Sequence, residues 1–168
     1  MKKIFRILSF TLAFILFFTF SASADGFAEK AKNADNEEII SALNNLLSDS
    51  ADYCKVWYYK PSNTMCADVA FDGLASFVLS SVDAGYGAKY KPWVIFNEAM
   101  MLLNDYVLWM FETMGRTDLA FSLSIVNDDM YIRNDSSKSS YTTILSIRNN
   151  KVWFDLLSEL EFLRLFKN

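Results

Sequence analysis

Apolar and polar positions follow a helical period through the first two thirds of the chain. Apolar residues recur every three or four positions over 39–47, which predicts an amphipathic helix from near Asp35 to about Tyr53 or Lys55. Polar residues spaced by four over 66–83 predict a second helix. A third helix is expected over 92–114, where apolar residues cover most of the circumference. Its apolar character indicates a central, mostly buried position.

Beyond Arg116 the period changes to two, which is typical of half-buried strands. The predicted strands cover residues 120–125, 130–133, 141–148 and 151–154. Asn149 and Asn150 suit a two-residue hairpin turn, and a last helix starts near Asp155 or Ser158. Helices followed by strands indicate the α+β class. We expect three N-terminal helices, a four-stranded antiparallel meander packed on the long apolar helix, and a closing C-terminal helix.

The N-terminal segment has the pattern of an export signal. Basic residues precede an apolar run over 7–20, and small residues follow it over 21–24 with alanines at the spacing of a cleavage site. This predicts a secretory signal peptide over 1–24, a single domain over 25–168 and a secreted or periplasmic location. The apolar run is shorter than the roughly 20 residues that span a bilayer, so no stable membrane insertion is expected after cleavage.

Composition excludes several functional classes. The chain has 16 basic and 20 acidic residues, a formal net charge of −4, and this acidic balance argues against nucleic-acid binding. It contains no histidine, which excludes Ser-His-Asp and Cys-His catalysis and histidine-ligated metals. No motif of a known family is present, and we expect no cofactor and no metal site.

The two cysteines are the only pair available for a disulfide. Cys54 and Cys66 are separated by a segment that contains Pro61, which suits a turn. In the oxidising compartment to which an exported chain is sent, this spacing predicts a disulfide between them.

Carboxylates are the one acid–base pair that the composition leaves for catalysis. Glu98 and Asp105 lie seven residues apart, on the same stripe of the predicted long helix. A secreted hydrolase could use two such groups across a cleft. The alternative interpretation is a solvated stripe along a helix edge.

Aromatic residues give a second candidate site. Tyr and Trp are the types enriched in binding surfaces, and six of them flank the two predicted loops before the second and third helices. They are Trp57, Tyr58, Tyr59, Tyr86, Tyr90 and Trp93. If exposed, they would bind a protein, a peptide or a small apolar or sugar ligand. If buried, they belong to the core and its rim.

The sequence therefore favours an exported, non-catalytic binding or interaction domain that acts through an aromatic loop surface or an apolar cleft. The surplus of apolar residues over 92–114 also leaves open a homodimer through this helix. The alternative is the carboxylate-based hydrolase.

Overall fold

The computed structural model describes residues 34–135 and 141–166. The predicted signal peptide over 1–24 lies outside the described residues. Within the described part of the chain, none of the helices is long and apolar enough to cross a membrane.

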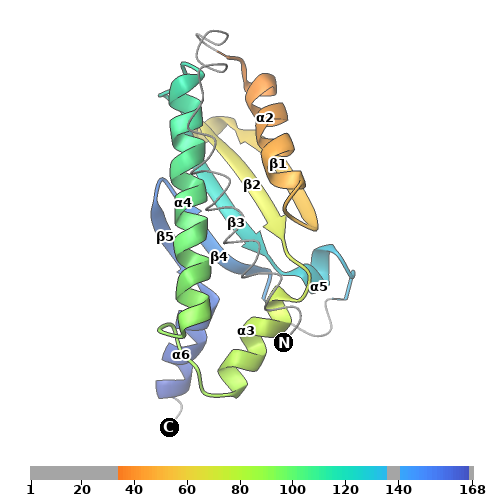
Figure 1. Cartoon of the computed structure of the whole chain (residues 1–168), viewed down its shortest axis with the longest axis vertical. Coiled ribbons are helices and arrows are strands. Elements are labelled where there is room, and N and C mark those ends of the chain that lie inside the picture. Colours follow the sequence, from red (N-terminus) through yellow and green to blue (C-terminus); the bar gives the residue numbers. More distant parts are fainter. Residues whose placement is uncertain (1–33, 136–140, 167–168) are drawn as a thin grey trace.

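Helices and strands are mixed along the chain, which confirms the α+β class (Figure 1). In chain order the elements are α2 (Asn36–Ser48), β1 (Tyr53–Tyr59), the 3-10 helix η2 (Lys60–Ser62), β2 (Thr64–Ala70), α3 (Leu74–Asp83), α4 (Lys91–Thr113), β3 (Ala120–Val126), α5 (Asp128–Tyr131), β4 (Thr143–Arg148), β5 (Lys151–Asp155) and α6 (Leu156–Phe166).

The five strands form one sheet in the order β1-β2-β3-β4-β5. Neighbouring strands are antiparallel except β2 and β3, which run parallel. The chain between β2 and β3 forms α3 and α4, which supply the long crossover that a parallel pair needs. Figure 1 shows α4 lying along the sheet, with α2 beside β1 and α6 close to the start of α4.

The long helix forms close to where its pattern predicted it. Pro92 lies in the first turn of α4, where its missing N–H costs no hydrogen bond. Trp93, Phe96 and Met100 are buried along one side of α4. They belong to the same core as Phe121 and Leu123 of β3, which confirms a sheet packed on this helix.

The hairpin formed by β1 and β2 was not predicted, because most of β1 was interpreted as an aromatic tail before the Pro61 turn and most of β2 as the start of a helix. The first helix ends at Ser48, and the segment predicted as the second helix is a strand up to Ala70. Residues four positions apart lie on the same side of a helix, but they also lie on the same side of a strand, whose period is two. The spacing of Asp68 and Asp72 therefore could not distinguish a helix from a strand. The predicted four-stranded antiparallel meander is therefore wrong: the described sheet has five strands and one parallel pair.

The strand predicted over 130–133 is also wrong. This segment contains the end of the short helix α5, which begins because the Asn127 side chain accepts a hydrogen bond from Asp129 N at 2.9 Å. Four alternating residues are too few to separate a strand from a helical turn.

The predicted disulfide is not formed in the structure, where Cys54 and Cys66 are free and not at disulfide distance. In the β1–β2 register Cys54 lies opposite Val69, and Cys66 lies opposite Trp57. Successive side chains of a strand point to opposite faces, so this register places the two thiols on opposite faces of the sheet. Cys54 faces α2, where its Sγ lies 3.9 Å from Asn44 Oδ1.

Candidate binding surface on the open face of the sheet

The two faces of the sheet differ in burial. Met65, Leu123 and Ile147 alternate with their neighbours onto one face and are fully buried there against the helices. The residues between them on the central strands, such as Ser122 and Ser124, are only partly buried. Among the residues that the structure describes, the helices cover the first face and leave the second open.

Cross-strand pairing arranges the open face in two rows. Paired residues point to the same side, so each row can be followed from strand to strand through the registers. The first row is Trp57, Cys66, Ser122, Arg148 and Lys151, and the second is Lys55, Asp68, Ser124 and Ser146, which the half-buried Phe154 follows on β5. We define the polar sheet face as these rows without Phe154, together with Trp153. The register leaves Trp153 unpaired at an irregularity of β5, and the contact of its ring with Lys151 assigns it to this face.

The two edge strands of the polar sheet face carry matching pairs of lysine and tryptophan. Lys55 Nζ lies 5.5 Å from the centroid of the Trp57 ring on β1. Lys151 Nζ lies 5.6 Å from the centroid of the Trp153 ring on β5. Trp153 is 66% exposed, which is high for a side chain of this size. Each edge therefore presents positive charge and aromatic surface together.

Small polar side chains lie between these edges. Arg148 donates a hydrogen bond to Thr64 Oγ1 at 3.4 Å, which holds its guanidinium across the central strands. Burial raises the pKa of the Asp68 carboxyl, and the Lys55 charge and the Ser124 hydroxyl oppose that rise only in part. Asp68 is the one acidic residue among the ten of the polar sheet face.

The thiol of the polar sheet face is poorly suited to nucleophilic attack. Burial and the nearby Asp68 charge raise the pKa of the Cys66 thiol, and Arg148 opposes this only in part. A thiol of raised pKa is a poor nucleophile, because the thiolate is the reactive form. Within the described residues no group of three potential ligands could hold a metal ion.

The aromatic residues predicted to form one binding surface are separated in the structure. Trp57 and Tyr59 lie on the open side of β1, and Tyr59 is exposed. Tyr58 points to the opposite side, where its hydroxyl donates to Asn63 Oδ1 at 2.7 Å in the β1–β2 turn. Tyr58 thus supports the turn and is not part of the open face.

The other three aromatic residues lie around the start of α4, at the opposite end of the molecule from the β1–β2 turn (Figure 1). Tyr86 is 49% exposed and stacks on Tyr90, with ring centroids 4.2 Å apart. Trp93 is fully buried, and its Nε1 donates to both carboxylate oxygens of Asp155 at 3.0 and 3.1 Å. Trp93 is therefore a core residue, and the six aromatics do not form one surface.

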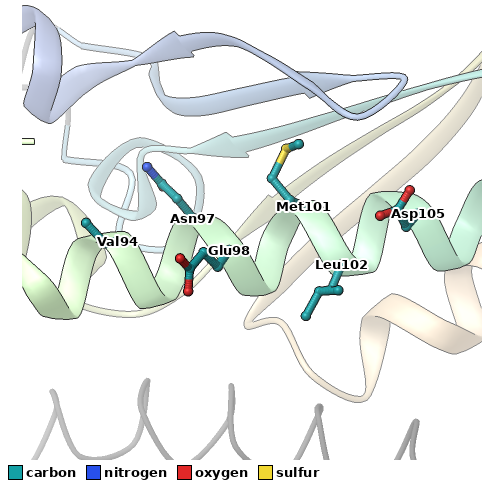
Figure 2. Close-up of a pocket in the computed structure, with 6 residues that line it drawn as sticks. All are labelled: Val94, Asn97, Glu98, Met101, Leu102 and Asp105. Atoms are coloured by element: carbon teal, nitrogen blue, oxygen red, sulfur yellow. The ribbon is translucent and has the colours of Figure 1, made fainter. Parts of the chain in front are cut away.

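The two carboxylates of the hydrolase hypothesis line one shallow, open pocket of about 470 Å³ on α4. Figure 2 shows Glu98 and Asp105 separated along the helix by the part that carries Met101 and Leu102. Both are exposed, and Asp105 accepts a hydrogen bond from the Asn150 side chain. Seven residues of helical rise separate them by about 10 Å.

Most of the apolar side chains of α4 are buried or partly buried within the protein itself. Leu102 and Trp109 are its exposed large apolar residues, each about half exposed. A homodimer through residues 92–114 stays a prediction, and these two side chains would form its contact.

The open face was not predicted from the sequence, because its organisation depends on the β1–β2 hairpin.

Comparison with known protein families, with curated proteins and with solved structures found no match to this chain. The geometry of the chain itself is therefore the basis for a functional proposal.

Proposed function

We propose that this protein is a non-catalytic binding domain that holds an extended ligand across the polar sheet face. The observation that carries the proposal is the open face itself, which has hydrogen-bonding and charged side chains in cross-strand rows and tryptophans on both edge strands. A sheet face that served only to shield the core would not need two large aromatic residues in partial contact with water.

The sizes of the side chains support a ligand that lies across the strands. Cys66, Ser122 and Ser146 form a low floor, while Trp57 and Trp153 rise at the two edges. Five strands spaced about 4.8 Å apart give a surface roughly 19 Å wide. That width fits several units of an extended polymer better than a compact small molecule, which favours enclosed pockets.

The hydrolase alternative has less support from the geometry. It requires two carboxyl groups that face each other across a cleft. Glu98 and Asp105 are exposed on an open pocket and follow each other along one helix. Export to a secreted or periplasmic location belongs to the binding proposal as well, and it rests on the pattern of residues 1–24.

Calorimetric titration with soluble polymers of different chemistry tests the proposal. The panel is a random copolymer of glutamate and tyrosine, its lysine–tyrosine counterpart, polygalacturonate and dextran. We expect at least one of them to bind the wild-type protein. The double variant W57A/W153A should weaken that binding by about tenfold or more, because exposed aromatic anchors carry much of the binding energy in such surfaces.

The matched control is Trp109→Ala, which removes an exposed tryptophan from α4, away from the polar sheet face. It should bind as the wild type does. If no polymer of the panel binds, or if W57A/W153A binds as tightly as the wild type while its circular dichroism is unchanged, the proposal is wrong.

A further inference from the structure

The charges of the polar sheet face differ in sign from the chain as a whole. The chain has a formal net charge of −4, yet the face carries Lys55, Arg148 and Lys151 against the single acid Asp68. Asp68 lies beside Lys55, and the Ser124 hydroxyl binds it, so part of its charge is compensated locally. The face therefore offers a net positive potential to a ligand.

These basic residues lie on both sides of the floor. Lys55 is on the edge strand β1, while Lys151 is on the opposite edge strand β5, with Arg148 next to it in the register. A ligand that crosses the sheet would meet positive charge at each end of its path. The width of roughly 19 Å corresponds to about six residues of an extended polypeptide.

The remaining side chains favour a polypeptide as the ligand. Tryptophan, tyrosine and arginine are the residue types that dominate protein–protein hot spots, and the face and its border hold Trp57, Tyr59, Arg148 and Trp153.

From these observations we infer that the polar sheet face binds a short acidic segment of another polypeptide. Carboxylates of the segment pair with Lys55, Arg148 and Lys151, and its apolar or aromatic side chains contact Trp57 and Trp153. This inference rests on the proposed function, because it names the ligand class of the same surface.

The test uses the same four polymers with charge-reversed variants of the protein. We expect the glutamate–tyrosine copolymer to bind, more weakly as salt is raised, and the lysine–tyrosine copolymer not to bind. The variant R148E/K151E should weaken binding of the acidic copolymer about tenfold or more. Its matched control, K89E/K91E, makes the same change in net charge with two exposed lysines before and at the start of α4, and it should bind as the wild type does.

The single variant Lys151→Glu keeps the inference testable if R148E/K151E does not fold. Lys151 is exposed on an edge strand, so its replacement should not disturb the fold. It should also weaken binding of the acidic copolymer. Equal binding of this copolymer to wild type, R148E/K151E and K151E would overturn the inference. So would binding of polygalacturonate, dextran or the basic copolymer alone; if W57A/W153A then abolished that binding, the proposed function would stand without the acidic ligand. The absence of any binding would overturn both.

Discussion

Asp68 belongs to the polar sheet face, and its partial burial also affects the stability of the fold. It lies on the interior strand β2, half-buried between Lys55 and Ser124 in its row. Burial raises the pKa of its carboxyl, because a charge loses hydration when it is partly removed from water. The ionised form is therefore less stable in the folded chain than in the unfolded chain.

Replacing Asp68 by Asn should stabilise the protein at neutral pH and not in acid. A pKa that is raised in the folded state gives stability that is fully present below the unfolded pKa of about 3.9 and is lost as pH rises through the folded pKa. Asn removes that loss and keeps an oxygen that can accept from Ser124. Thermal unfolding of both proteins across pH 3 to 7 measures the difference, which should grow with pH. A constant or shrinking difference would contradict the assigned cause.

At the scale of elements, strand alternation decides which side chains can meet. The hairpin of β1 and β2 brings Cys54 and Cys66 onto neighbouring strands, but its register sends them to opposite faces. Sequence separation alone favoured a disulfide, because the intervening loop is short and contains Pro61. The pairing of Trp57 with Cys66 decides otherwise.

Both cysteines should therefore remain thiols in the folded, unreduced protein. Alkylation in denaturant without reductant, followed by mass spectrometry of the peptides, should find both Cys54 and Cys66 modified, because neither can reach the other across the sheet. A sample that is first reduced serves as the reference. Modification of the cysteines only after reduction would show that the strand register differs from the one described here.

At the scale of the whole molecule, the long crossover that joins β2 to β3 has to bring two distant parts of the chain together. Asp128, directly after β3, is fully buried, and it accepts hydrogen bonds from Gly73 N at 2.8 Å and Ala75 N at 2.9 Å. It thereby caps the start of α3, where Gly73 adopts a φ of 84°. Arg133 lies 3.6 Å from the same carboxylate. One side chain thus joins the two ends of the parallel pair.

Replacing Asp128 by Ala should lower the free energy of unfolding by about 2 to 3 kcal/mol, because it leaves the buried N–H groups of Gly73 and Ala75 without their acceptor. Urea unfolding followed by circular dichroism measures the change. The exposed Asp83 gives the matched control, since Asp83→Ala should change stability by no more than about 0.5 kcal/mol. Equal effects of the two substitutions would show that the Asp128 cap does not stabilise the crossover.

The sequence allowed some residue types of the candidate site to be predicted, but it did not allow their arrangement in space to be predicted. Trp57 and Tyr59 were recognised as binding candidates, and they do lie on the open face of the sheet. Trp153 and Arg148 were not recognised, because the sequence around a single residue on a strand does not show which residues of other strands lie beside it. Trp93 lies in the core instead, where it is fully buried and its indole N–H donates to Asp155, 62 residues away.

The sequence by itself determined the α+β class, the long helix α4 and the strands β3, β4 and β5, because these segments carry long or consistent periodicities that local physics enforces. Only the tertiary structure decided the parallel pairing of β2 with β3, the separation of the cysteines and the open, basic face. Each of these depends on strand register, in which a shift of one residue moves every side chain to the other face. Register is fixed by contacts between segments that are distant in the sequence. The surface on which the proposed function depends can therefore be recognised only in the tertiary structure.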